Sequence, residues 1–102
     1  MNHPSIDPQK AELVADFLKE AFPGHHIYSS EEFDRDCQFY RIDEDGAGRL
    51  KHRLRVSREF LDDHSSPAIP RRLHAWQVVR ILQEAGPRSV LVLNTGCAIE
   101  AG

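Results

Sequence analysis

The feature that most constrains the fold of this chain is residues 37–56, which have the pattern of a β-hairpin. Two runs of alternating polar and apolar residues flank the tetrapeptide at 45–48, Asp-Gly-Ala-Gly. Asp and Gly between such runs are typical of a tight turn, because glycine adopts positive φ without a Cβ clash. Side chains alternate between the two faces of a strand. In the second strand one face therefore carries Leu50, His52, Leu54 and Val56, and the other carries Arg49, Lys51, Arg53 and Arg55.

The first strand of this hairpin admits two orientations. The residues that face the core are either Gln38, Tyr40 and Ile42, or Cys37, Phe39 and Arg41. If the turn consists of residues 46–47 alone, Cys37 lies opposite Val56. Tyr40 and Ile42 would then share the basic face of the hairpin. A slip of one residue reverses every side chain, so the sequence leaves the register open.

The basic face of the hairpin requires either a ligand or neutralisation within the protein. Neighbouring charges on one strand face lie about 7 Å apart and repel by roughly 0.6 kcal/mol in water before salt screening. In one interpretation the row binds the phosphates of RNA or DNA, and Tyr40 stacks on a base. In the other, acidic residues of the same protein neutralise it. The row consists of Arg49, Lys51, Arg53 and Arg55.

The distribution of charge favours neutralisation within the protein. The net charge is −3. Residues 1–45 carry eleven acidic and four basic residues, a balance of −7, whereas residues 46–102 carry five acidic and nine basic residues, a balance of +4. A nucleic-acid-binding domain usually has a basic excess overall. Nucleic acid is therefore a partner that the sequence allows but does not favour.

The remaining elements follow from hydrophobic periodicity and from residues that start and stop helices. A helix begins after Asp7, which can cap it, with Pro8 at its first position, and it ends at residues 23–24, Pro-Gly. Further predicted elements are a short strand over 25–30, a short helix after Ser57, a helix over 70–85 and a strand over 89–94, while 95–102 show no clear pattern. We therefore expect one α+β domain over residues 1–102 with the order α-β-β-β-α-α-β. Its small antiparallel sheet is built on the central β-hairpin, and the helices pack on the sheet.

Composition and motifs argue against several functional classes. No apolar run approaches the roughly 20 residues that span a bilayer, and the N-terminus lacks the pattern of a signal peptide. We expect a cytoplasmic protein that does not bind a membrane, in which Cys37 and Cys97 are thiols. The six histidines lack the spacing of a zinc site, so we expect neither a metal nor another cofactor. An enzyme that uses Cys97 or a histidine is the least favoured interpretation, because no motif places a base beside the thiol.

The strand over 89–94 predicts an assembly. Its valines, Val90 and Val92, face one side and its leucines, Leu91 and Leu93, face the other, so both sides need cover. Either the N-terminal helix and the 70–85 helix cover opposite sides in a three-layer monomer, or both lie on one side and a second copy covers the other.

The 70–85 helix favours the second arrangement. Its apolar residues nearly encircle the axis, and Leu73 and Trp76 lie outside the main stripe. We therefore predict a homodimer whose interface includes Leu73, Trp76, Leu91 and Leu93. The function that the sequence favours is a non-catalytic protein-interaction module with an unidentified protein partner. RNA or DNA binding through the basic strand is the first alternative.

Overall fold

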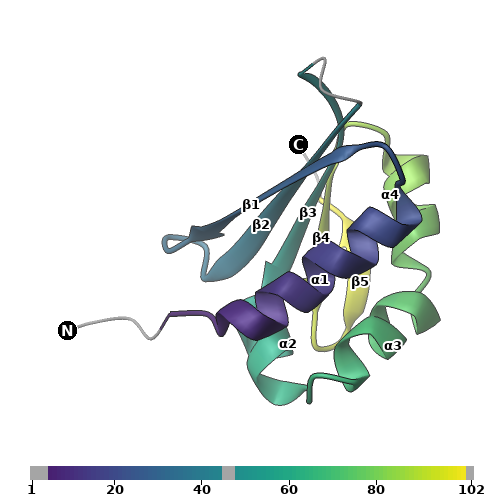
Figure 1. Ribbon diagram of the computed structural model, residues 1–102. Helices are drawn as coiled ribbons and strands as arrows, with labels where there is room; N and C mark the ends of the chain where they lie inside the picture. The colour runs from purple at the N-terminus through teal and green to yellow at the C-terminus, as the bar shows by residue number, and fades with distance from the viewer. Residues whose placement is uncertain (1–4, 45–47, 101–102) are drawn as a thin grey trace.

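The computed structural model describes residues 5–44 and 48–100 (Figure 1). Of the predicted turn at 45–48, residues 45–47 lie outside the described residues. The elements follow in the order α1 (Pro8–Ala21), β1 (His26–Glu32), β2 (Cys37–Glu44), β3 (Arg49–Ser57), α2 (Arg58–Asp63), α3 (Ala68–Ala75), α4 (Val78–Ala85), β4 (Ser89–Leu93) and β5 (Gly96–Ile99). The predicted α+β class and the order of the predicted elements are confirmed, with one further helix, because the predicted 70–85 helix is divided, and one further strand at the end.

The five strands form one mixed sheet in the order β1-β2-β3-β4-β5. All neighbouring pairs are antiparallel except β3 and β4, which are parallel. The parallel pair arises because α2, α3 and α4 form a crossover between β3 and β4, and a parallel connection needs a crossover of this kind. The chain then turns back at Asn94 and Thr95, so that β5 pairs with β4. The sheet is therefore not purely antiparallel, and the segment without a sequence pattern supplies its edge.

The register of the β2–β3 hairpin places Tyr40 opposite Leu54 and Ile42 opposite His52. Tyr40 and Ile42 consequently face the core and are fully buried. Tyr40 lies on the face of the sheet opposite to the basic residues, so its predicted role in stacking a base is wrong for this structure. The hydroxyl of Tyr40 donates a hydrogen bond of 2.7 Å to the carbonyl of Ala11 in α1, which satisfies its polar group inside the core.

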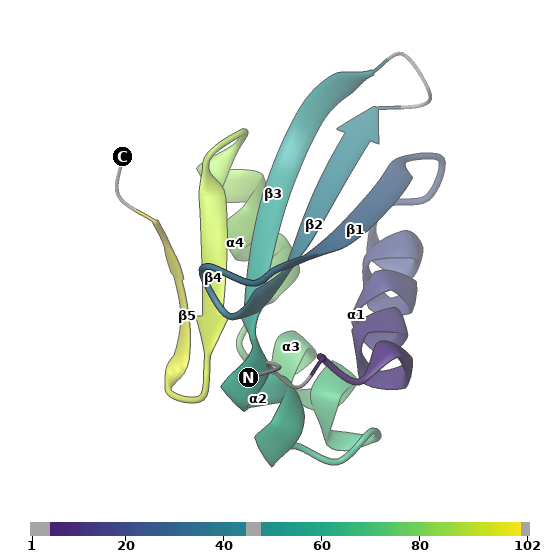
Figure 2. The ribbon, with the colours of Figure 1, turned by 90° about the vertical axis from the view of Figure 1, so that its left-hand side faces the viewer.

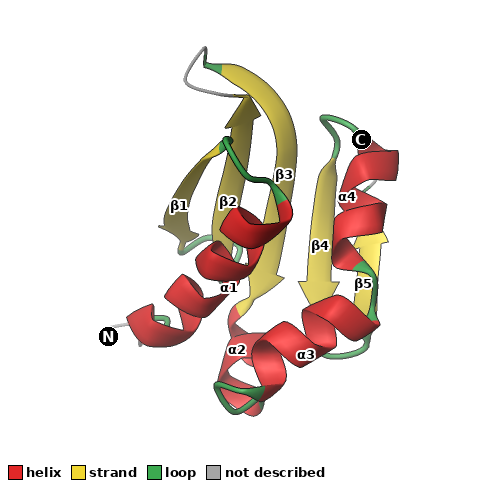
Figure 3. Ribbon diagram, turned by 45° about the vertical axis from the view of Figure 1, so that its right-hand side comes forward, coloured by secondary structure: helices red, strands yellow, loops and turns green. Residues whose placement is uncertain are grey.

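The helices cover one face of the sheet. Figure 3 shows α1 and α4 in front of the strands, with α3 between them near the lower ends of β3 and β4, and Figure 2 shows the strands from the uncovered side, with α2 at one end of the sheet. Fully buried residues of the core come from these helices and from the facing sides of β2, β3 and β4: Val14, Leu18, Tyr40, Ile42, Leu54, Val56, Phe60, Leu73, Val78, Leu82, Val90 and Val92. The three-layer arrangement is therefore wrong, and the alternative with both helices on one face describes the fold.

The predicted helix over 70–85 is two helices. The chain leaves the helical path at Gln77, whose φ of 54° is left-handed. In one continuous helix, Leu73 and Val78 would point about 140° apart, because successive residues turn by about 100°. The break re-aims α4, so that both Leu73 and Val78 are fully buried. The apolar residues that encircle the predicted helix thus pack into a single core, and no second partner is needed to explain Leu73.

Helix α1 agrees closely with its prediction. The side chain of Asp7 accepts a hydrogen bond of 2.9 Å from the backbone N–H of Gln9, and Pro8 occupies the first turn. Val14 and Leu18 lie on the buried side of the helix. The local capping signals and the apolar stripe therefore determine both the position of this helix and its packing.

Candidate functional site on the open face of the sheet

No helix of the described part of the chain covers the second face of the sheet, which we call the open face (Figure 2). The strand registers arrange its central side chains in two rows that run across the strands. One row consists of Ser30, Phe39, Arg55, Leu91 and Ala98, and the other includes Arg41, Arg53 and Ser89. The turn between β1 and β2 passes in front of β3 in this view, and Arg35 belongs to it.

Acidic residues neutralise part of the predicted basic row. Lys51 contacts Glu44 at 3.2 Å, and Arg55 contacts two carboxylates. Arg49 and Arg53 are exposed, and neither forms an ion pair with another described residue. The expected internal neutralisation therefore applies to Lys51 and Arg55, and the other two members of the row remain open to solvent.

Arg55 lies at the centre of the open face. Its Nε–H donates to Glu32 at 2.7 Å, and its Nη1 group donates to Ser89 Oγ and to Glu100 Oε1, both at 2.8 Å. Its guanidinium also lies over the ring of Phe39, 5.2 Å from the ring centroid. Only 15% of the Arg55 side chain is exposed. Arg55 therefore joins four neighbouring segments, the ends of β1 and β5, the middle of β2 and the start of β4.

Arg55 helps to lower the pKa of both carboxylates that it contacts. The hydrogen bond from Arg55 is the largest influence on Glu32 and holds the pKa of its carboxyl below the usual value. Burial alone would raise the pKa of Glu100, but hydrogen bonds from Ser89 and Arg55 outweigh it and lower the pKa. The hydrogen bond with Glu32 likewise raises the pKa of Arg55. All three groups are consequently charged at neutral pH.

A hollow of about 390 Å³ adjoins this centre. Arg53 and Arg55 of β3 line it beside Ser89 of β4. The other lining residues are Arg35, Pro87, Arg88 and Glu100. We call this site the arginine hollow. Four guanidinium groups lie along its wall, although they come from three separate parts of the sequence.

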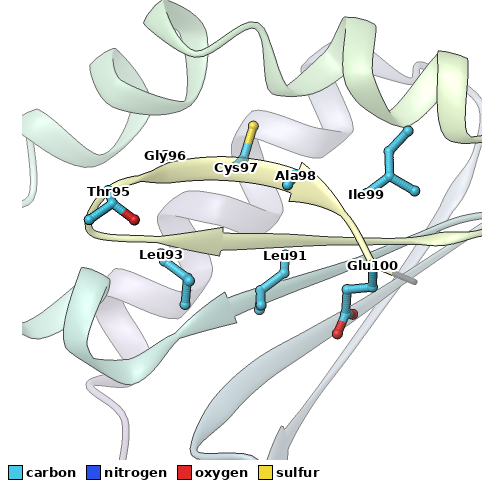
Figure 4. A pocket seen from close by; sticks show the side chains of 8 residues that line it. All are labelled: Leu91, Leu93, Thr95, Gly96, Cys97, Ala98, Ile99 and Glu100. Carbon is cyan, nitrogen blue, oxygen red and sulfur yellow. The ribbon is translucent and has the colours of Figure 1, made fainter. Parts of the chain in front are cut away.

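A second hollow, of about 320 Å³, lies at the β4–β5 hairpin (Figure 4). Leu91, Leu93 and Glu100 point to one side of the hairpin, toward the open face, whereas Cys97 and Ile99 point to the other side, toward the helices. Leu93 is 42% exposed. We call Leu91, Leu93 and Ala98 the apolar patch, and its members lie on the two final strands of the sheet.

The structure separates the four predicted interface residues. Leu73 has no exposed surface, so its assignment to an interface is wrong for this fold. Trp76 is half-buried and packs against Phe60 on the helix side, with ring centroids 5.7 Å apart. Leu91 and Leu93 belong to the apolar patch on the open face. A single flat interface cannot contain both Trp76 and the apolar patch, because the sheet lies between them.

Neither thiol is activated as a nucleophile. Cys37 is buried, and burial together with a hydrogen bond of 3.3 Å to Glu32 raises the pKa of its thiol to about 12. Burial also raises the pKa of Cys97, whose Sγ lies 3.8 Å from the carbonyl oxygen of Trp76. Lowered thiol pKa values are characteristic of reactive cysteines. The geometry therefore gives no support to a catalytic role for Cys97.

Two of the histidines, His52 and His64, contact backbone carbonyl groups. Nδ1 of the buried His52 lies 2.9 Å from the carbonyl oxygen of Gly86, and burial lowers the pKa of its imidazole. Nδ1 of His64 lies 2.7 Å from the carbonyl oxygen of Phe60. Among residues 5–44 and 48–100, no three histidine, cysteine or acidic side chains are grouped so that they could hold a metal ion. None of the helices there is both long and apolar enough to cross a bilayer.

Comparisons of the chain with protein-family models, with characterised proteins and with solved structures give no match. The open face is therefore interpreted from its own geometry. Sequence reasoning identified Arg53, Arg55, Leu91 and Leu93 on this face but missed Arg35, Arg88, Glu32 and Glu100. These four residues carry no local pattern, and only the fold of the sheet brings them to one site.

Proposed function

We propose that the protein is a non-catalytic protein-interaction module that acts as a homodimer in the cytoplasm. The observation that carries this proposal is the edge of the sheet at β5, together with the apolar patch beside it. The interface proposed here consists of β5 and the apolar patch, without Leu73 and Trp76.

The two edges of the described sheet differ in how they are protected. Strand β1 carries Glu31 and Glu32 near its end, and charged residues on an edge strand discourage pairing with another chain. Strand β5, Gly96–Ile99, contains no charged residue and no proline. Its outer backbone groups are therefore available to a further strand, although the strand is short.

A second copy of the same chain fits this edge. Two identical strands that pair antiparallel are related by a twofold axis, so one surface serves both partners. Such pairing would continue the sheet from one copy into the next and would bring the two apolar patches together. Burial of a leucine side chain contributes roughly 1.5–3 kcal/mol, and Leu93 is 42% exposed in the single chain.

A pair of matched variants tests this interface. Ala98 and Ser30 are both exposed and lie at opposite ends of the same cross-strand row. Ala98→Lys introduces two facing positive charges at the proposed twofold interface, and we expect it to weaken association at least about tenfold. Ser30→Lys places the same charge at the β1 edge and should leave association unchanged. Sedimentation equilibrium of both variants measures the effect, and equal association constants would contradict the proposal.

RNA or DNA binding through the basic row is the second candidate function. It is favoured by the exposure of Arg49 and Arg53, which have no ion-pair partner among the described residues. Two phosphate contacts predict a slope of about −1.8 for log K against log salt, whereas four would give about −3.6. A titration with a mixed RNA and DNA pool at low salt tests this candidate, and absence of binding removes it.

A further inference from the structure

The arginine hollow has more positive charge than the protein neutralises. Its wall carries Arg35, Arg53, Arg55 and Arg88. The carboxylates at this site are Glu32 and Glu100, and both contact Arg55. Four positive charges against two negative charges leave a local excess of two.

The three arginines other than Arg55 have no carboxylate partner of their own in the described part of the chain. No ion pair joins Arg35, Arg53 or Arg88 to an acidic residue there. Arg88 instead donates its Nε–H to the carbonyl oxygen of Ala85 at 3.2 Å, which orients its side chain. Like charges gathered around a hollow repel, and a bound anion would remove that repulsion.

The sheet holds the base of the hollow in place. The Cα atoms of Arg53 and Ser89 are register partners on the parallel strands β3 and β4. The Nη1 group of Arg55 is fixed by Ser89 and Glu100, both at 2.8 Å. The exposed side chains of Arg35, Arg53 and Arg88 surround this fixed centre. A rigid base with exposed donors around it is suited to enclosing a small ligand.

We propose that the arginine hollow binds a small organic phosphate. A phosphate monoester carries about −1.5 to −2 charges at neutral pH, which matches the local excess of two. Guanidinium groups also bind phosphate oxygens in a bidentate geometry. The volume of about 390 Å³ suits a small molecule. Leu91 lies beside Arg55 in the strand register, so the apolar patch is within reach of the organic part of the ligand.

The phosphate contacts of this proposal do not depend on the dimer, because the arginines of the hollow all belong to one chain. Leu91 is the residue that the ligand would share with the proposed dimer interface. The residues of the hollow also differ from those of the basic row. Arg35 and Arg88 belong to the hollow but not to the row, whereas Arg49 belongs to the row but does not line the hollow.

Titration calorimetry of the full chain with phenyl phosphate and with inorganic phosphate, at constant ionic strength, tests the proposal. We expect binding of phenyl phosphate, and a loss of affinity of at least about tenfold in each of the variants Arg53→Gln and Arg88→Gln. The control Arg49→Gln removes a basic residue from the same face of β3 and should change the affinity less than about twofold. Far-ultraviolet circular dichroism of each variant verifies that the fold is retained.

The ligand series separates the sources of phosphate. Binding of phenyl phosphate more tightly than inorganic phosphate supports the proposal in full, because the organic part then contributes through Leu91. A short oligothymidylate that binds while both small phosphates fail, and that is weakened by Arg49→Gln, would overturn the proposal in favour of nucleic-acid binding. No binding of phenyl phosphate at about 10 mM, or equal loss in Arg49→Gln and Arg53→Gln, would also overturn it.

Discussion

Arg55 on β3 and Glu32 at the end of β1 form a hydrogen-bonded ion pair of 2.7 Å across the intervening strand β2. The β1–β2 turn, which follows Glu32, passes in front of β3 on the open face of the sheet (Figure 2). Because Glu100 shares the same guanidinium, the pair also fixes the end of β5. One arginine thus shapes both the arginine hollow and the edge strand that we propose as an interface.

Replacement of Arg55 should destabilise the fold. Arg55→Gln leaves two half-buried carboxylates without their cation, and we expect a loss of about 2 kcal/mol in the free energy of unfolding, moderated by their partial exposure to water. Lys51→Gln, which breaks the exposed pair with Glu44, should cost less than about 0.5 kcal/mol. Urea denaturation measures both changes, and equal effects would show that the Arg55 cluster is no stronger than a surface ion pair.

The same cluster predicts a dependence of stability on pH. The pKa values of Glu32 and Glu100 are lowered in the folded protein, so the unfolded chain binds protons more readily in acid. Their contribution is present above the usual carboxyl value of 4.5 and is lost as the pH falls through the lowered values. Urea denaturation in steps from neutral pH to about pH 3 should show this loss. In Arg55→Gln the free energy of unfolding should fall less steeply between neutral pH and about pH 3. An unchanged pH dependence in this variant would contradict the assignment of the loss to Glu32 and Glu100.

The helix break at Gln77 predicts opposite effects of two glycine substitutions. Gln77 has a left-handed φ of 54°, which glycine adopts without strain, so Gln77→Gly should stabilise the protein by about 0.5–1 kcal/mol. Gln83 lies inside α4 and is exposed, and Gln83→Gly should destabilise by about 1 kcal/mol. Thermal unfolding of both variants distinguishes the two positions. Destabilisation at both would indicate one continuous helix.

Thiol labelling should distinguish the two cysteines. Cys37 is 2% exposed and its thiol pKa is raised to about 12, whereas Cys97 is only partly buried. We therefore expect Cys97 to react with a thiol reagent faster than Cys37, and both to react more slowly than free cysteine at neutral pH. Mass spectrometry of the labelled native protein measures the order. Labelling of Cys37 first would contradict the burial of its thiol beside Glu32.

Local sequence signals predicted the parts of the fold that depend on neighbouring residues. Asp7 and Pro8 determine where α1 begins, and the alternation from Arg49 to Val56 determines which side of β3 is buried. The break at Gln77 had no such signal, because neither glycine nor proline occurs there. The break is favourable because it allows both Leu73 and Val78 to be buried. That advantage depends on the whole core and not on the residues next to Gln77.

The candidate site was less predictable for the same reason. The basic strand was visible in the sequence, but its partners Glu32 and Glu100 are separated from Arg55 by 23 and 45 residues. The orientation of β2 depended on a one-residue choice of register, which the hydrogen bond from Tyr40 to Ala11 and the burial of Ile42 decide. The four residues of β5 are too short a segment to produce a pattern of alternation.

The solution mass of the unmodified chain tests the proposed homodimer most directly. Light scattering behind size exclusion at micromolar concentration should give twice the chain mass of 11.6 kDa, and dilution should lower the mass as the edges at β5 separate. Leu93→Lys should shift the same sample toward the single chain. A mass of 11.6 kDa for the unmodified protein across the whole concentration range would contradict the account.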